Sequence, residues 1–356
     1  MTILDRYIGL ALARSTLLVA LILLPLFTLL DLVQQLDEIG TGNYGLIDAL
    51  IYEAFRMPGY LLSLMPFIAL LGASIALGGL AHSNELTAMR ASGVSIERIG
   101  LATLKTGALI MLITIVIMEW VAPPLHQQAV KRQSMALSGS DILIEKHGFW
   151  IRQDNRFINV RNIHQGHTPA DIHIFEFDSA KQQLDLYLHA DRAETTNRKQ
   201  WLYKDLILKK YKEKSIDTRH EAELAWDSYL TEKQLQVLEL PISSLPPSGL
   251  YQYLKYLRAS GQVTERFEMV FWQKATLPVA VAVMMLCAFP FVFGSLRASS
   301  AGKRIVLATI TGISFQLASQ LLANLGLMLD LVPMLTSLMP MIIFLLLGAV
   351  LMRRAL

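Results

Sequence analysis

Residues 81–93 read Ala81-His82-Ser83-Asn84-Glu85-Leu86-Thr87-Ala88-Met89-Arg90-Ala91-Ser92-Gly93. This short polar stretch lies between two long apolar runs, residues 60–80 and 99–121. Each run has about the 20 apolar residues that a bilayer-spanning helix needs. The stretch therefore connects two membrane spans, and the rest of the chain is arranged around that connection.

The connecting stretch is itself predicted to be a helix. Ser83 or Asn84 can cap its start, Glu85 suits the first turn because of the helix dipole, and Gly93 can end it in a left-handed conformation. Three side chains spaced three or four residues apart would share one face that points away from the membrane: Leu86, Met89 and Arg90. Two interpretations are open, a surface connector or a docking helix that receives mechanical work from a cytoplasmic partner.

Composition places the chain in a membrane. Hydrophobic residues make up 53% of the sequence and charged residues only 17%, whereas an ordinary soluble domain is about a quarter charged. The mean hydropathy of +0.42 agrees with this class. The single cysteine, Cys287, lies in an apolar run, which excludes an intramolecular disulfide and favours a small buried side chain.

The predicted fold class is an α-helical membrane protein with three spans, a large polar insert and three further spans. An amphipathic helix over residues 4–14 leads into six spans, expected at residues 15–36, 59–81, 99–122, 271–296, 305–329 and 333–352. The expected domains are residues 1–122 with the connecting helix at 83–93, the insert at residues 123–266, and residues 267–356.

Basic residues set the orientation, because Lys and Arg concentrate in cytoplasmic loops. They gather at both ends of the chain and in the loops after spans two and four: Arg6, Arg14, Arg90, Arg98, Arg297, Lys303, Arg304, Arg353 and Arg354. The loop at residues 31–56 is instead acidic. Both termini and the loop at residues 83–98 are therefore predicted to be cytoplasmic, and the insert is predicted to face outward.

The insert is predicted to be a β-domain. Residues 184–190 alternate between apolar and polar, which is typical of a half-buried strand. Two pairs of short runs flank turn sequences and predict hairpins: residues 149–152 with 157–161, and residues 193–196 with 201–208. Such strands indicate a sandwich or a jelly roll. Past a proline-rich stretch, Ser248 is expected to cap a helix over residues 249–258 that links the β-domain to span four.

Motifs for catalysis are absent from the sequence. No GxxxxGK[ST], HExxH, GxSxG or CxxC pattern occurs, so the chain is predicted not to be an enzyme and not to hydrolyse ATP through a P-loop. His164, His167 and His173 are interpreted as solvated turn histidines rather than as a metal cluster.

Polar residues inside the spans are more informative, because they are costly in lipid and normally face protein or a cavity. A stripe along span five serves either hydrogen bonding between helices or the lining of a path for an amphiphile: Gln316, Ser319, Gln320 and Asn324. A group at the outer end of span one is expected to be a solvated helix end: Asp31, Gln34, Gln35, Asp37 and Glu38. Glu119, just before Trp120, is expected at the membrane interface.

Short motifs follow one another from end to end of the chain: Leu4-Asp5-Arg6-Tyr7-Ile8, Met89-Arg90-Ala91-Ser92-Gly93, Glu119-Trp120-Val121-Ala122-Pro123, Tyr253-Leu254-Lys255-Tyr256-Leu257, Ser260-Gly261-Gln262, Trp272 with Lys274, and Phe293-Gly294 with Leu296-Arg297. Each motif is weak alone. In this order, on a three-plus-three topology, they make the chain resemble the permeases of the lipopolysaccharide export system, the LptF/LptG family, and within it the LptG-like members.

The resemblance implies a machine of several proteins. It implies a heterodimer with an LptF-like permease and a dimeric cytoplasmic ATPase, LptB, which would bind the ATP and magnesium, while this chain holds no cofactor. It also implies a single-span LptC-like protein, a periplasmic LptA-like bridge, and an insert that is a periplasmic β-jelly roll. No nucleic acid is expected among the partners. The chain would lie in the inner membrane of a Gram-negative cell.

The resemblance also assigns residues. The connecting helix becomes the family's coupling helix, with these positions toward the ATPase: Ser83, Glu85, Leu86, Met89, Arg90 and Gly93. Spans one and five would form a lateral gate beside the lipid cavity, with these positions toward the lipid: Phe27, Leu30, Asp31, Gln34, Asp37, Glu38, Arg56, Tyr60, Lys274, Gln316, Ser319, Gln320 and Asn324.

One departure from the family concerns the outer end of span one. Some relatives carry lysines there that are thought to meet lipid A phosphates, where this chain has Asp31, Asp37 and Glu38. A carboxylate does not pair with a phosphate directly. The positive charge is therefore expected from Arg56, Lys274 or the partner permease, or from a divalent cation that bridges acid and phosphate.

The expected function is to extract lipopolysaccharide from the outer leaflet of the inner membrane and to expel it into the β-domain when the ATPase closes. Two other classes of protein are compatible with the sequence. A membrane scaffold with a docking β-domain predicts that the polar stripe of span five is sealed against a partner helix. An intramembrane lipid-modifying enzyme would use Asp31 or Glu119.

Overall fold

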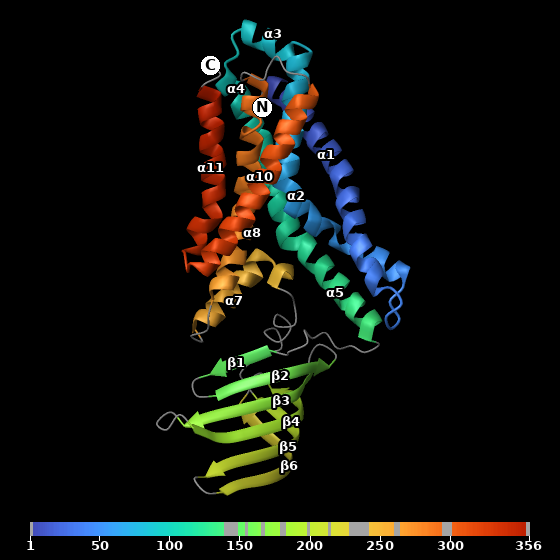
Figure 1. Cartoon of the computed structure of the whole chain (residues 1–356), viewed down its shortest axis with the longest axis vertical. Helices are drawn as coiled ribbons and strands as arrows, with labels where there is room; N and C mark the ends of the chain where they lie inside the picture. Colours follow the sequence, from blue (N-terminus) through green and yellow to red (C-terminus); the bar gives the residue numbers. More distant parts are fainter. Residues whose placement is uncertain are drawn as a thin grey trace.

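The computed structural model describes residues 3–138, 149–153, 156–164, 168–178, 183–197, 200–212, 215–227, 242–259, 264–293 and 301–353. A bundle of long helices carries both ends of the chain at one pole, and a β-sheet lies at the opposite pole (Figure 1). Six helical segments are long and apolar enough to cross a membrane, three before the sheet in sequence and three after it. The predicted fold class is confirmed.

The first two spans are longer than the sequence predicted. Helix α1 (Ile3–Gln35) is continuous, so the amphipathic start and span one are a single helix that ends in the short 3-10 turn η1 (Leu36–Glu38). Helix α2 (Leu46–His82) begins well before residue 59. Asp48 accepts a hydrogen bond from the backbone N–H of Gly45 at 3.0 Å, and this cap lets the helix start in polar sequence.

The third span extends beyond the expected domain boundary at residue 122. Helix α4 (Ile96–Val116), whose N–H at Arg98 is capped by Ser95, continues through a π-turn, η2 (Ile117–Val121), into α5 (Ala122–Ser138). Pro123 and Pro124 cannot donate the backbone hydrogen bonds of an α-helix, which accounts for the wider turn just before them. The candidate span therefore runs from Ile96 to Gln133.

After the sheet, helix α7 (Pro247–Ala259) packs on α8 (Glu265–Leu286). The second half of the bundle also contains the short helix α9 (Phe289–Phe293), α10 (Ala301–Met328) and α11 (Pro333–Arg353). The sequence predicted that Ser248 caps α7, and that prediction is wrong. Ser248 lies inside the first turn, and its hydroxyl donates to Glu119 on η2, whose carboxylate also lies 3.4 Å from the Ser248 N–H. Glu119 therefore ties α7 to the π-turn. Ser260-Gly261-Gln262 and Arg297 lie outside the described residues.

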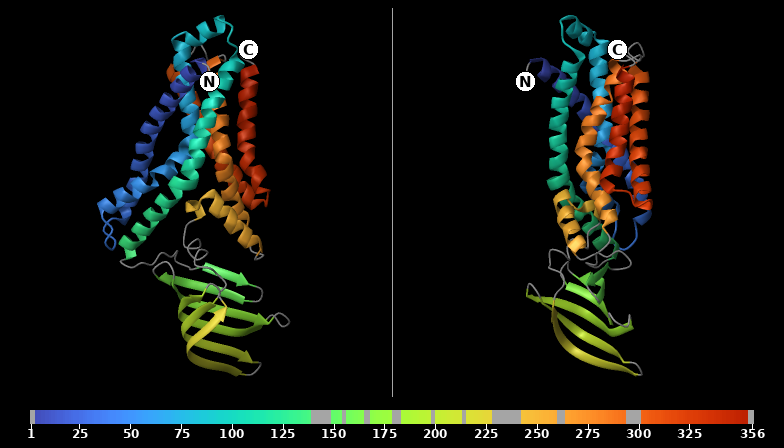
Figure 2. Two further views of the ribbon diagram at one scale, coloured as in Figure 1. Left: turned by 180° about the vertical axis from the view of Figure 1, so that it is seen from behind. Right: turned by 90° about the vertical axis from the view of Figure 1, so that its left-hand side faces the viewer.

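The β-domain is one antiparallel sheet whose strands are neighbours in sequence order: β1 (Phe149–Gln153), β2 (Arg156–His164), β3 (Thr168–Asp178), β4 (Gln183–Asn197), β5 (Gln200–Lys212) and β6 (Ser215–Asp227). Both predicted hairpins are confirmed, as β1–β2 and β4–β5. The sheet is strongly twisted (Figure 2). One face is an apolar cluster that includes Ile158, Ile172 and Leu188, and Tyr256 of α7 packs against it.

The histidines of the insert differ from the prediction. His173 lies within β3 and its side chain is only 13% exposed, so it is not a solvated turn residue. His164 is the last residue of β2, and His167 lies outside the described residues. The histidine beside His173 is His189 on the neighbouring strand β4, which the sequence prediction did not include.

Two contacts hold α1 against the bundle. Asp5, with a side chain only 1% exposed, forms ion pairs with Arg98 at 2.8 Å and Lys105 at 2.7 Å, both on α4. Further along, α1 meets α2 where a Cβ added to Gly72 would lie 2.7 Å from the Cα of Thr16. Small residues permit this close approach, as is common between membrane helices.

Gly72→Ala is expected to destabilise the bundle by about 1–3 kcal/mol, because the added methyl overlaps the backbone of α1. Gly79→Ala on the same helix is the matched control, since a Cβ there meets nothing within 4 Å. Thermal unfolding in detergent measures both. A Gly72 variant as stable as the Gly79 variant would contradict the close packing.

Candidate functional site

Helix α3 (Glu85–Ala91) crosses the pole of the bundle that carries the chain ends (Figure 1). Its N-cap is Asn84, one of the two predicted residues, but Asn84 has a φ of 60° and its side chain makes no cap hydrogen bond. Ser83 instead donates to Oε1 of Glu85 at 2.9 Å, and Tyr7 of α1 donates to Oε2 at 2.5 Å. Gly93 has a φ of 92°, as expected for a left-handed helix end.

The two hydrogen bonds to Glu85 have an electrostatic consequence. Those from Tyr7 and then Ser83 lower the pKa of Glu85 from its ordinary value, so its carboxylate is charged at neutral pH. Glu85 is thus an anion that joins α3 to the first turns of α1.

The apolar face of α3 points toward the bundle, not away from it. Leu86 is 3% exposed and Met89 packs against the same core cluster, so the predicted outward direction of these two residues is wrong. A helix of seven residues has little stability of its own and needs this apolar anchor. Arg90 is exposed, as predicted.

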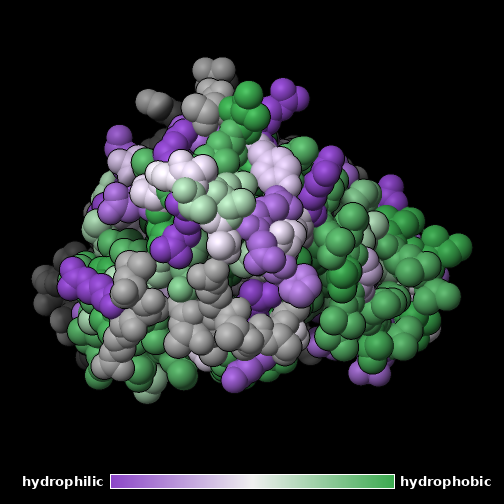
Figure 3. Space-filling view, turned by 90° about the horizontal axis from the view of Figure 1, so that it is seen from above, coloured by the Kyte–Doolittle hydropathy of each residue, from purple (hydrophilic) through white to green (hydrophobic). Residues whose placement is uncertain are grey.

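A cavity of about 770 Å³ opens beside α3. Arg90, Gly93 and Glu97 lie along it, and apolar residues of α9 and α11 form its far wall. Seen from this pole, hydrophilic and apolar side chains are intermixed over the centre, and a hydrophobic flank lies to the right, on the side of α1 (Figure 3). This pole therefore has a surface of intermixed polar and apolar side chains, with a cavity beside α3.

A second cavity of about 550 Å³ lies toward the β-domain end and collects many of the predicted lipid residues. Its walls come from α2, η2, α5, α8, α10 and α11. The predicted residues that it brings together are Arg56, Tyr60, Lys274, Gln316, Ser319 and Gln320. Its lining is mainly apolar with a few polar groups, which suits an amphiphile.

Charges in this second cavity are already partly paired. Arg56 forms an ion pair with Asp31 at 2.8 Å, and its guanidinium lies over the rings of Tyr52 and Tyr60 at 5.3 and 5.0 Å. The Tyr60 hydroxyl also donates to Asp31. Lys274 donates to the backbone carbonyl of Leu245 at 2.5 Å. Asp31 therefore holds Arg56 at the cavity wall.

Comparison with known proteins decides the family. The family model described as lipopolysaccharide export system permease LptF/LptG matches residues 6–354. The chain belongs to the LptF/LptG family. It is 35% identical to the lipopolysaccharide export system permease protein LptG of Haemophilus influenzae, over 96% of this chain and 95% of that protein. It is 31% identical to LptG of Escherichia coli strain K12, over 99% of this chain and 98% of that protein.

The remaining lipid positions predicted for this LptF/LptG permease do not line the second cavity. Four are exposed on α1 and η1: Phe27, Leu30, Gln34 and Asp37. Glu38 accepts a hydrogen bond from Gln133 of α5 at 2.7 Å, and Asn324 is exposed on α10. The α1 positions therefore face outward from this chain.

Two residues near the second cavity of this LptF/LptG chain escaped prediction. His126 lines the cavity from α5, which the sequence assigned to the insert. Glu53 is 5% exposed, and neither of its carboxylate oxygens has a hydrogen-bond partner within the described part of the chain. Glu53 was not predicted because the sequence analysis placed residue 53 in a loop, whereas it lies in the first turns of α2.

Proposed function

We propose that this chain is the LptG-like half of a permease pair in an ABC transporter that moves lipopolysaccharide out of the inner membrane. The pair would consist of this chain and an LptF-like permease, and a cytoplasmic LptB dimer would bind ATP and magnesium. An LptC-like protein and an LptA-like bridge would receive the lipid at the β-domain. Here the pole with α3 is cytoplasmic and the β-domain periplasmic, in agreement with the basic loops.

The observation that carries the proposal is the placement of α3 and the second cavity along the same helices. α2 reaches from Arg56 and Tyr60 in the cavity wall to His82, just before α3. A force applied to α3 therefore acts on a helix that also forms the cavity. In the proposed cycle, closing of the ATPase dimer moves α3 and narrows the cavity. The lipid then leaves toward the β-domain.

The surfaces of the spans support pairing with a second permease. The apolar windows of α2 and of the span Glu265–Phe293 are 72% buried, whereas those of the first, fifth and sixth spans are 22%, 17% and 22% buried. α1 and α10 thus present large apolar faces to lipid or to a partner. A gate between spans one and five of the paired permeases uses these two faces.

The polar stripe of span five favours transport over the scaffold alternative. The scaffold predicts that Gln316 and Gln320 are sealed against a helix, but both line the second cavity. Transfer of acyl chains out of the bilayer costs about 0.8 kcal/mol for each methylene. This cost requires a source of energy, which ATP hydrolysis by the partner ATPase would supply.

Native mass spectrometry of the complex drawn gently from its own membranes tests the proposal. We expect one second permease, two copies of an ATPase and bound lipopolysaccharide. Finding the chain alone, or with unrelated periplasmic proteins, would overturn the transporter and favour the scaffold.

A further inference from the structure

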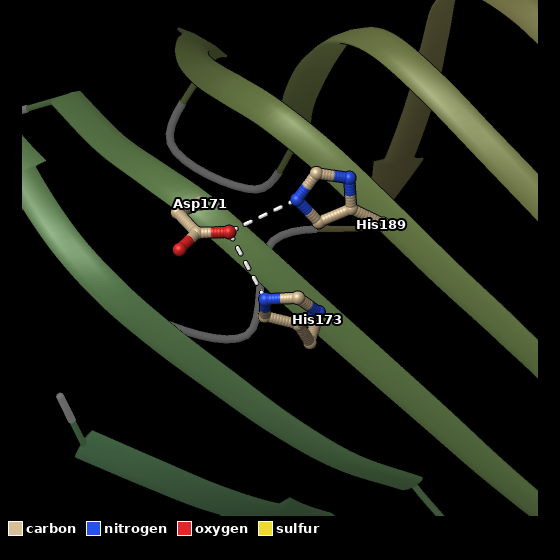
Figure 4. Close-up of side chains that lie close together, drawn as sticks. All are labelled: Asp171, His173 and His189. Atoms are coloured by element: carbon tan, nitrogen blue, oxygen red, sulfur yellow. Dashed lines mark hydrogen bonds and ion pairs between the residues drawn. The ribbon is translucent and has the colours of Figure 1, made fainter. Parts of the chain in front are cut away.

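Three metal-ligating side chains meet on the face of the β-sheet opposite its apolar cluster. Asp171 and His173 lie two residues apart on β3, and His189 stands directly across from His173 on β4 (Figure 4). One ligand atom from each residue lies within 4.8 Å of the other two. None of the three belongs to α3 or to either helical cavity.

The two imidazoles converge on one oxygen. Nε2 of His173 lies 3.0 Å from Oδ1 of Asp171, and Nε2 of His189 lies 2.9 Å from the same atom. A tetrahedral zinc ion about 2.1 Å from each ligand would separate the ligand atoms by ~3.4 Å. Widening the cluster by a few tenths of an ångström would therefore admit such an ion.

One ring nitrogen has no hydrogen bond. Nε2 of His173 is buried and makes no well-formed hydrogen bond among the described residues, and its closest polar neighbour is the Asp171 carboxylate at 3.0 Å. A buried polar atom without a full hydrogen bond is unfavourable. A metal ion between the three side chains would satisfy it.

Neighbouring residues contact the ligands and fix which of their atoms face the proposed ion. Nδ1 of His173 lies 2.8 Å from the Tyr187 hydroxyl, which leaves Nε2 as the nitrogen available to an ion. Arg161 contacts the other carboxylate oxygen of Asp171, Oδ2, at 3.7 Å. Oδ1 is thus the oxygen that remains turned toward the two rings.

We propose that Asp171, His173 and His189 form a binding site for a divalent transition-metal ion of the zinc class. Two imidazoles and one carboxylate suit Zn²⁺, whereas Mg²⁺ and Ca²⁺ prefer oxygen ligands. Three protein ligands leave at least one coordination position for water or an anionic ligand. Asp171 is 34% exposed and His189 is 23% exposed, so the ion can enter from solvent.

Direct metal binding by the full-length chain tests the site. The chain, carrying a tag without histidines, is stripped with a chelator in detergent and titrated with Zn²⁺, and bound metal is counted after equilibrium dialysis. We expect one Zn²⁺ per chain. His189→Gln should weaken binding at least tenfold and Tyr187→Phe by about tenfold, because even outer partners of metal ligands change affinity by about 10–100-fold.

His220→Gln is the matched control. His220 is exposed on the same face of the sheet and pairs with Ile207, which in turn pairs with His189, yet it lies outside the cluster. It should bind Zn²⁺ like the unchanged chain. Absence of Zn²⁺ from the unchanged chain, or equal binding by the His189 and His220 variants, would overturn the proposal.

A measurement on the unchanged chain covers the case in which the variants misfold. Co²⁺ in place of Zn²⁺ should give the strong visible absorption of a four- or five-coordinate site with nitrogen and oxygen ligands. The weak absorption of a six-coordinate aqua ion would instead overturn the site. This readout does not depend on transport and therefore separates failure of the metal site from failure of the proposed function.

Discussion

Glu85→Arg is expected to abolish lipopolysaccharide transport while ATP hydrolysis by the assembled complex continues. The substitution removes the acceptor for Tyr7 and Ser83 and places a cation where α3 presents an anion. A partner surface complementary to the anion would then be repelled. Lipid release and ATPase activity, measured together in proteoliposomes of the full complex, check this result.

Tyr7→Phe is the matched control for Glu85. It removes the hydrogen bond between α1 and α3 but keeps the charge of Glu85. We expect partial loss of transport with normal assembly. Unchanged transport in the Glu85 variant would rule out docking through α3.

The second large effect concerns the lipid phosphates. Replacing both Arg56 and Lys274 by glutamine is expected to weaken lipopolysaccharide binding by roughly tenfold or more for each cation, the scale of a charge-assisted hydrogen bond. Asp31→Asn should act in the opposite direction, because it removes the carboxylate paired with Arg56 at 2.8 Å and leaves that cation for a phosphate. Bound lipid per purified complex measures both variants.

Arg132→Gln controls for general loss of positive charge near this end of the bundle. Arg132 lies on α5 over the ring of Phe55, outside the second cavity. It should leave lipid binding unchanged. If binding is insensitive both to chelators and to the Arg56 and Lys274 changes, then neither a bridging cation nor these residues recognise the phosphate.

The sequence was sufficient for the spans because each is a long apolar segment, and for the β-hairpins because their turns are short and polar. It failed where a polar segment continues a helix. Residues 46–58 looked like a loop, yet Asp48 caps α2 and the helix begins there. The same error hid Glu53 and, at the start of α5, His126.

The direction of α3 and the histidine pair required three-dimensional contacts. Spacing put Leu86 and Met89 on one face of α3, but only the core beneath them decides that this face points inward. Likewise, His173 and His189 are 16 positions apart, and only the register between β3 and β4 makes them neighbours. Neither the core nor the register can be read from spacing along one strand or helix.

The ion pairs of Asp5 can form only some time after Asp5 itself has been synthesised, because both partners lie far along the sequence. One of its partners, Lys105, follows it by 100 residues. At a synthesis rate of about 5–20 residues per second, roughly 5–20 s pass before that lysine leaves the ribosome. Before the interval ends α1 can already pack against α2, but for most of it the carboxylate of Asp5 has neither Arg98 nor Lys105 beside it. The two ion pairs at the start of α1 can therefore form only after the third span has been made.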